Sequence, residues 1–463
     1  MEQHKFHHAL KILEDVCYGC THCMQVCPTE AIRVRNGKAK LLANRCVDCG
    51  ECVRACPVEA IIVEQDDFSR IFDFKYRVAI VPAVLIGQFP RDIPTRRIYS
   101  ALMEEGFTDV YEAEHGAEVL GQEIEQYIKR NKDNKPVMSS FCPAVVRLIQ
   151  VKFPGMVDQI MLLKSPLDIA AMSYKKQLIE KGIPREDIGV FYITPCAAKI
   201  AAVKSPVGEE FSDIDGVINM NFIYNKIYAR LNDDKQISCV IPSKAQLSDK
   251  AMIWSLTAGE SPHAKGRSLA IDGIHNVIEF LESVENDDAG TFEFLELRAC
   301  DQSCAGGILN PTNRFLTTER LHNRADQYKK DIRKGKIAPL STKPELKKYL
   351  VEHIEISRVN PRSMLKLDDD RIEAMKKLER VRNIMCFLPG IDCGGCGSPS
   401  CEALAKDIVK KKADISDCVF VQKKMQVIKK LHPEHSIRIV DKIWGADRLD
   451  KDCSKKGAKD EGS

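Results

Sequence analysis

The sequence lacks the features of a membrane or secreted protein. Its longest apolar run, Val78 to Gly87, is too short to cross a bilayer. The first residues, Met1 to Leu13, are polar and rich in histidine, unlike a secretory signal peptide. Basic stripes with interleaved aromatic residues, which would indicate nucleic-acid binding, are also missing. We therefore expect a cytoplasmic protein that binds neither a membrane nor nucleic acid.

We also expect no disulfides, although the 463-residue chain holds 19 cysteines. The count is odd, the chain is large and nothing points to secretion, so a disulfide scaffold explains them poorly. Metal–thiolate chemistry in a reducing compartment explains them better. It also changes the charge. The formal net charge of +3 counts every thiol as neutral. Four 4Fe–4S sites, each about −2 with its thiolates, would bring the total to roughly −5.

Residues 1–70 contain an internal repeat. The pattern Cys-x2-Cys-x2-Cys-x3-Cys-Pro begins at Cys17 and again at Cys46, and the residues after each proline repeat as well. This is the spacing of bacterial two-cluster ferredoxins, in which the fourth cysteine of each run binds the other cluster. The predicted ligands are Cys17, Cys20, Cys23 and Cys56 for one 4Fe–4S cluster, and Cys46, Cys49, Cys52 and Cys27 for the other. A zinc site, the alternative, would need only four ligands and no repeat.

Residues 75–360 alternate strand-like and helix-like segments, which is typical of an α/β domain. Predicted buried strands cover 77–84, 137–140, 188–193 and 293–297, and predicted helices cover 95–105 and 168–181. Three short motifs that follow or end these strands hold Cys142, Cys196, and the pair Cys300 and Cys304. Ligand sites in open α/β sheets collect at the carboxyl ends of the strands, so we expect the motifs to meet.

The spacing within these motifs suggests what they bind. Cys300 and Cys304 are four residues apart, so on a helical turn both sulfurs face the same way. Cys196 and Lys199 are three apart, which lets the lysine lie over whatever Cys196 holds. Spacing alone thus predicts a buried 4Fe–4S site with a nearby cation. Four unrelated core cysteines are the alternative.

Residues 365–440 form a third cysteine-rich region, predicted to be small and mostly helical. Its ligands would be Cys393, Cys396, Cys401 and Cys418, with glycines that let backbone amides approach the sulfurs. The spacing resembles the small 4Fe–4S domain of corrinoid iron–sulfur proteins and of membrane-bound ferredoxin:NAD reductase subunits. Structural zinc is the alternative. Residues 441–463 are a charged tail that we expect to be disordered.

Residues 1–430 as a whole resemble an FeFe hydrogenase. That family has an N-terminal ferredoxin region and catalytic-domain motifs of the form TSCCP, MPCxxKxxE and ExMxCxxGCxxGGGxP. Here the first motif reads Ser139-Ser140-Phe141-Cys142-Pro143, and the second reads Thr194-Pro195-Cys196-Ala197-Ala198-Lys199. The third runs from Glu296 through Cys300 to Cys304-Ala305-Gly306-Gly307. All three in order, after a ferredoxin region, are highly specific, and they imply a two-lobed α/β catalytic domain.

The resemblance implies a six-iron H-cluster. Its 4Fe–4S part would be held by Cys142, Cys196, Cys300 and Cys304, and Cys304 would bridge to a diiron unit with CO, cyanide and a dithiolate bridge. Lys199 would hydrogen-bond a cyanide, a charge-assisted contact. Segments that match those lining the family's diiron pocket contain Pro82, Ala83, Ser165 and Pro166, and Gly306 and Gly307 are expected beside the cofactor.

The chain departs from the family where protons would move. In catalytic members the position of Phe141 is a cysteine that relays protons to the bridging amine, and a phenyl ring cannot carry a proton. Our alignment puts Ile124 and Tyr127 at the positions of the family's relay glutamates. Glu123 or Glu125 would substitute if the register is off by one.

Two further departures lie in the second and third motifs. Ala202 replaces the glutamate that ends the second motif, and Arg298 replaces the methionine of the third, which adds a cation near the cluster. Proton transfer by a positioned group typically contributes about 10²–10⁴-fold to a rate. Turnover should therefore be slow, although the metal-ligand set is intact.

The sequence thus predicts an FeFe-hydrogenase-like enzyme with slow reversible H2 oxidation and a sensory or regulatory role, its electrons passing through 4Fe–4S clusters. Sensory members also lack the relay cysteine and carry the same small cluster domain, although they usually continue into a PAS-type module. The alternatives are a competent hydrogenase with another proton route, and a hydrogenase-derived electron-transfer or cluster-assembly protein without the diiron unit. Expected partners are H2 and protons, a ferredoxin or a signalling or redox subunit, diiron maturation enzymes and, in a homodimer, a second copy.

Overall fold

The computed structural model describes residues 6–131, 133–232, 247–286, 292–336, 344–362, 367–368 and 370–446. The chain forms two compact units. The first consists of Met1–Leu10, Val47–Gly50 and Val63–Arg362, and the second of Lys11–Cys46, Glu51–Ile62 and Ser363–Ser463. Most of the predicted ferredoxin region (1–70) therefore shares a unit with the predicted C-terminal cluster region (365–440), while the predicted central domain (75–360) lies in the first unit. Among the described residues, no helix is both long and apolar enough to span a membrane.

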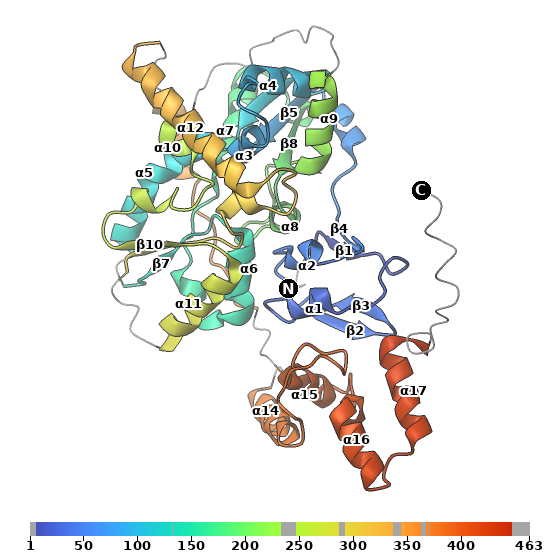
Figure 1. Cartoon of the computed structure of the whole chain (residues 1–463). Helices are drawn as coiled ribbons and strands as arrows, with labels where there is room; N and C mark the ends of the chain where they lie inside the picture. Colours follow the sequence, from blue (N-terminus) through green and yellow to red (C-terminus); the bar gives the residue numbers. More distant parts are fainter. Residues whose placement is uncertain are drawn as a thin grey trace. The chain divides into compact units, whose positions relative to one another are not determined.

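A four-stranded parallel sheet forms one half of the first unit (Figure 1). Its strands in spatial order are β6 (Asp109–Glu112), β5 (Tyr76–Val81), β8 (Ile188–Thr194) and β9 (Gly216–Asn219). Every residue of β8 is buried, as expected for a central strand covered on both faces. The helices α7 (Pro166–Glu180) and α9 (Met220–Asn232) pack on the sheet, with α5 (His115–Arg130) on α7 and α4 (Thr95–Glu104) on α9.

A second, smaller parallel sheet completes the unit. It consists of β10 (Ser268–Ile271), β11 (Phe294–Leu297) and β7 (Val137–Met138). The remaining elements are α3 (Ala83–Gly87), α6 (Pro143–Lys152), α8 (Ala197–Lys204), α10 (Asp249–Met252), α11 (Ile274–Asn286), α12 (Arg314–Arg333), α13 (Pro344–Glu352), and the short 3-10 helices η1 (Phe68–Asp73), η2 (Pro154–Gln159), η3 (Arg185–Asp187), η4 (Ser261–His263) and η5 (Ser303–Gly306). The predicted mixed α/β class is confirmed.

The strand predicted over 77–84 is wrong at its carboxyl end. β5 stops at Val81, and Pro82 caps the start of α3. Proline has no N–H to donate to a neighbouring strand. The next N–H, that of Ala83, donates to both carboxylate oxygens of Glu114, at 2.8 and 2.9 Å, instead of joining the sheet.

The second unit joins small strands to a helical C-terminal region. Its strands are the antiparallel pair β2 (Ile32–Arg35) and β3 (Lys38–Leu41) and the pair β1 (Leu10–Ile12) and β4 (Ile61–Val63). Its helices are α1 (His22–Gln25), α2 (Glu51–Arg54), α14 (Arg371–Met385), α15 (Cys401–Val409), η6 (Ile415–Asp417), α16 (Val419–Val427) and α17 (Pro433–Trp444). A buried ion pair links the two parts, because Arg33 Nε donates to Asp407 at 2.6 Å.

The charged tail begins later than the sequence suggests. Residues 441–444 end the helix α17, because Ile443 is buried and the Trp444 indole N–H donates to the Gly395 carbonyl at 3.1 Å. Residues 447–463, the rest of the predicted tail, lie outside the described residues.

Candidate active site

The four central cysteines lie at the ends of strands, as predicted. Cys142 follows β7 and caps the start of α6, and Cys196 follows β8 and caps the start of α8. Cys300 comes after β11, and Cys304 lies in η5. Burial raises the pKa of the Cys196 thiol to about 12; Lys199 opposes that rise, and Cys304 and Cys142 add to it. Three of the four thiols therefore act on one another electrostatically.

Lys199 is a buried cation within this group. Its ammonium lies 3.7 Å from Cys304 Sγ and donates to the Tyr192 hydroxyl at 3.3 Å. Burial by itself lowers the pKa of Lys199, but the anionic forms of Cys304, Tyr192 and Cys196 outweigh burial and hold it above its ordinary value. The structure thus places a lysine next to the cysteines, in the position where the sequence predicts a cation.

Phe141 contacts two cations. The Lys199 ammonium is 4.6 Å from the centroid of its ring, and the Arg298 guanidinium is 3.8 Å from it. The ring is buried, so each contact takes place away from water, where a cation over an aromatic face gains about 2 kcal/mol or more. Phe141 is therefore held firmly in the site.

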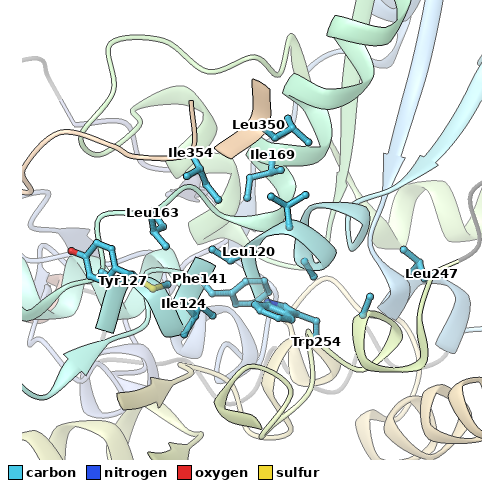
Figure 2. Packing of buried hydrophobic residues seen from close by; sticks show 14 of the residues in the cluster. Leu120, Ile124, Tyr127, Phe141, Leu163, Ile169, Leu247, Trp254, Leu350 and Ile354 are labelled. Atoms are coloured by element: carbon cyan, nitrogen blue, oxygen red, sulfur yellow. The ribbon is translucent and has the colours of Figure 1, made fainter. Parts of the chain in front are cut away.

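The residues at the predicted relay positions pack in an apolar cluster. Figure 2 shows Phe141, Ile124, Tyr127 and Trp254 among the packed residues of one cluster, and Ile124 and Tyr127 come from α5. The Tyr127 hydroxyl accepts a hydrogen bond from the backbone N–H of Leu162 at 3.1 Å. The register that places Ile124 and Tyr127 near Phe141 agrees with this packing.

The two glutamates that a shifted register would offer behave differently from each other. Glu125 forms surface ion pairs with Lys129 at 2.5 Å and Lys265 at 2.9 Å. Glu123 is buried on α5.

A cavity of about 100 Å³ adjoins Phe141 and Lys199. Ser165 lies on it, as the resemblance suggested, together with Ser140, Lys164, Asp168 and Glu209. The structure does not place Pro82, Ala83, Pro166, Arg298, Gly306 or Gly307 on its wall. Pro82 and Pro166 instead begin the helices α3 and α7, and the N–H of Ala83 is taken by Glu114.

Sequence reasoning missed two buried carboxylates near the site. Glu114 precedes α5, and burial raises its pKa to about 7, although the Ala83 N–H and Lys199 counteract the rise. Glu260 is fully buried and contacts Arg298. Glu114 lies just before α5, the helix that holds the predicted relay positions, whereas nothing in the sequence around Glu260 points to the site.

Gly306 and Gly307 have a packing reason for lacking a side chain. A Cβ at Gly306 would lie 1.8 Å from the Asp301 carbonyl oxygen, and one at Gly307 would lie 2.5 Å from the Pro195 carbonyl oxygen. The glycines thus let the third motif turn tightly and approach the second, which brings Cys304 and Cys196 together.

Replacing Gly306 with alanine should disrupt the four-cysteine site, because the Asp301 carbonyl must move to make room. We expect iron content to fall by about four atoms per chain or more, the content of one 4Fe–4S cluster. Gly155→Ala is the matched control, since nothing lies within 4 Å of the position that its new methyl group would take. Equal iron content in both variants would contradict this account.

The second unit gathers two further sets of four cysteines. Cys17, Cys20, Cys23 and Cys56 line one small cavity, and Cys393, Cys396, Cys401 and Cys418 line another. Backbone N–H groups point at the sulfurs, from Ala39 to Cys17 at 3.3 Å and from Ala60 to Cys56 at 3.2 Å. Four thiols around one hollow with N–H donors are what a 4Fe–4S cluster requires. Of the other predicted set, Cys46 and Cys52 are buried, and Cys27 and Cys49 are partly exposed.

Comparison with known families agrees with this geometry. Residues 75–239 match the model of the iron-only hydrogenase large subunit, C-terminal domain. This part of the chain is similar in sequence to the large subunit of iron-only hydrogenases. This hydrogenase-like region is flanked by a 4Fe–4S dicluster domain over residues 16–61 and a putative Fe–S cluster domain over residues 388–420. These ranges fall within the three cysteine-rich regions predicted from the sequence.

Individual relatives of this hydrogenase-like chain are distant. It is 24% identical over 326 residues to iron hydrogenase 1 of Clostridium pasteurianum, covering 58% of this chain and 54% of the relative. It is 27% identical over 248 residues to the NADP-reducing hydrogenase subunit HndD of Solidesulfovibrio fructosivorans, covering 49% and 37%. The chain thus spans about half or less of the length of these relatives. A solved variant of the FeFe hydrogenase HydA1 from Chlamydomonas reinhardtii superimposes with a TM-score of 0.44 at 13% identity, over 62% of this chain and 94% of the other.

Proposed function

We propose that the protein is an FeFe-hydrogenase-type enzyme that interconverts H2 with protons and electrons slowly, in a sensory or regulatory role. The observation that carries this proposal is the buried ring of Phe141, packed with Ile124 and Tyr127 where the resemblance places proton carriers. Loss of a positioned proton-transfer group costs about 10²–10⁴-fold in rate. A site that handles electrons but few protons suits detection of H2 better than bulk turnover.

The residues fit the implied cofactor. Cys142, Cys196, Cys300 and Cys304 would hold its 4Fe–4S part, because they are thiols placed after the strands β7, β8 and β11, and three of them act on one another electrostatically. When bound, the diiron unit supplies the binding and cleavage of H2. Lys199 keeps a positive charge next to Cys304 and beside the cavity, where it can donate to an anionic ligand.

The cysteine-rich regions on either side supply the electron route in this proposal. Clusters held by residues 1–70 and 365–440 would exchange electrons with a ferredoxin or with a signalling or redox subunit. Diiron maturation enzymes would be needed to complete the site, and the reducing cytoplasm suits its thiolates. A homodimer is compatible with this arrangement.

Infrared spectroscopy tests the proposal directly. The full chain is expressed with diiron maturation enzymes and examined for CO and cyanide stretching bands, together with H2 oxidation and evolution. We expect both kinds of band and a slow, reversible activity. A protein that carries its 4Fe–4S clusters but shows neither kind of band has no diiron unit, and that result would overturn the proposal.

A second candidate function, a competent hydrogenase with another proton route, is favoured by one observation. Ser165 and Asp168 lie on the cavity that Phe141 and Lys199 also line. The Ser165 hydroxyl donates to Asp168 Oδ2 at 2.7 Å, and burial raises the pKa of Asp168. A serine and a protonatable carboxylate in contact form a short path along which a proton can move.

Replacing Asp168 with asparagine separates the two candidates. If protons pass through Asp168, we expect H2 turnover to fall by about 10²-fold or more, since asparagine cannot titrate. If the slow-turnover proposal holds, Asp168→Asn should change the rate little. Infrared bands of the diiron unit serve as the control. They must be present in Asp168→Asn, so that a lower rate cannot be due to loss of the cofactor.

A further inference from the structure

Three charged side chains and a serine form a buried cluster beside the cysteine site. From the end of β11, Arg298 donates to Glu260 Oε2 at 3.0 Å, and its Nε lies 3.4 Å from Glu296 Oε1. The Ser139 hydroxyl donates to the same Glu260 oxygen at 2.6 Å. Each of these four residues is at most 1% exposed. No water competes for these contacts, so the charges must balance within the protein.

The count of charges is uneven, because two carboxylates face one guanidinium. With both glutamates ionised, the cluster would carry one uncompensated negative charge in the interior, which is strongly unfavourable. Both oxygens of Glu296 already face N–H donors, because Oε2 accepts the backbone N–H groups of Glu260 at 3.0 Å and Ser261 at 2.7 Å, and Oε1 lies 3.4 Å from Arg298 Nε. Of the two glutamates, Glu260 is therefore the one that has room for a proton when a further negative charge reaches the cluster.

Glu260 has an oxygen available for that proton. Among the described residues, its Oε1 has no hydrogen-bond partner. Burial and the neighbouring Glu296 raise the pKa of Glu260 to about 7, although Arg298 and Ser139 counteract the rise. The other titratable group nearby is His263 on η4, whose pKa is lowered by burial and by Lys250, so that it is neutral at neutral pH.

Arg298 connects this cluster to the cysteines. Burial lowers its pKa, but Glu296, Glu260, Cys304 and Cys142 together raise it above its ordinary value, so the guanidinium feels both groups of charges. Arg298 attracts both the Glu260 carboxylate and any negative charge added at the cysteine site. In a medium of low polarity, such an added charge favours the protonated form of a neighbouring carboxylate.

We propose that Glu260 takes up one proton from water when the four-cysteine site gains one electron. The electron comes from a one-electron iron–sulfur donor, the Glu260 carboxylate becomes a carboxylic acid, and the net charge of the buried region is unchanged. The proposal rests on the 4Fe–4S half of the proposed function, but it needs neither the diiron unit nor any H2 activity. It makes the potential of the central site depend on pH, so that proton supply can tune electron transfer.

Redox titration of the full chain, loaded with 4Fe–4S clusters and expressed without maturation enzymes, tests this. The paramagnetic signal that disappears in Cys300→Ser identifies the central cluster. Its midpoint potential should fall as pH rises through neutrality, with a slope approaching about 59 mV per pH unit, the shift of a one-electron couple for a tenfold change in proton concentration. In Glu260→Gln the potential should be independent of pH and equal to the low-pH value of the unaltered protein. Glu125→Gln, which changes a surface ion pair, should keep the slope.

Two results would overturn the proposal: a potential that does not vary with pH in the unaltered protein, or a slope that survives in Glu260→Gln. A readout without any variant guards against a misfolded glutamine protein. Reduction of the unaltered chain should produce a new protonated-carboxyl C=O infrared band that shifts in D2O, and its absence also contradicts the proposal. A chain without CO and cyanide bands but with the pH-dependent potential would disprove the diiron unit and leave the role of Glu260 standing.

Discussion

Phe141→Cys combined with Ile124→Glu is expected to raise H2 turnover by about 10²-fold, the lower end of what a positioned proton-transfer group contributes. A thiol can carry a proton and a phenyl ring cannot. Ile124 lies in the same packed cluster as Phe141, so a carboxylate at position 124 would be the next proton carrier after a thiol at position 141. Phe141→Cys alone should give a smaller gain, because the wall behind it stays apolar. H2 evolution and oxidation, measured per diiron unit from infrared band intensity, check this.

Phe141→Ala is the matched control for this experiment. It opens similar room and leaves the diiron pocket equally accessible, but it adds no group that carries a proton. Both single variants lose the ring that contacts Lys199 and Arg298, so they share that cost in stability. Equal gains in the alanine and cysteine variants would show that the ring limits access by size, and no gain in the cysteine variants would contradict the lost-relay account.

Lys199→Met should remove the diiron unit and leave the 4Fe–4S clusters in place. The ammonium lies 3.7 Å from Cys304 Sγ and borders the cavity, so it is the charged donor available to an anionic ligand there. Without it, iron content should fall from about 18 to about 16 atoms per chain, as the stoichiometry of four 4Fe–4S clusters requires. CO and cyanide bands should disappear together with H2 activity.

Lys204→Met is the control for Lys199→Met. Lys204 ends the same helix, α8, but its ammonium pairs with Asp66 at 2.6 Å, away from the cavity. It should keep the iron content and the bands of the unaltered protein. If Lys199→Met also retains about 18 irons, Lys199 does not hold the diiron unit. If the unaltered chain already has about 16, Lys199 has some other use.

The four-cysteine site shows how far local pattern reaches. Motifs at strand ends predicted that Cys142, Cys196, Cys300 and Cys304 would converge, because ligand sites collect at the carboxyl ends of parallel strands. In the structure these strands belong to two sheets, β8 to one and β7 and β11 to the other. The place of Lys199 was also foreseeable, because it lies one helical turn from Cys196. The environment of Phe141 was not, since Lys199 and Arg298 reach its ring from the ends of strands in different sheets.

The predicted pocket-lining residues do not all border the cavity beside Phe141. Ser165 lies on it, whereas Pro82 and Ala83 do not, and the Ala83 N–H donates to Glu114. That interaction joins residues from two separate strand ends. Sequence periodicity describes which face of an element is buried, but it does not specify which side chain of another element meets it.

The sequence by itself predicted the cysteine sets, the α/β class of the central region and a phenylalanine at the position that the resemblance gives to a relay cysteine, because these depend on residue type and local spacing. Only the tertiary structure showed that Phe141 contacts two cations and packs in one cluster with Ile124 and Tyr127 of α5, and that Glu260 shares its buried charge with Arg298 and Glu296. Glu260 lies 38 residues before Arg298 in the chain. Burial and long-range contact set the energy of a charge, and both are properties of the folded chain alone.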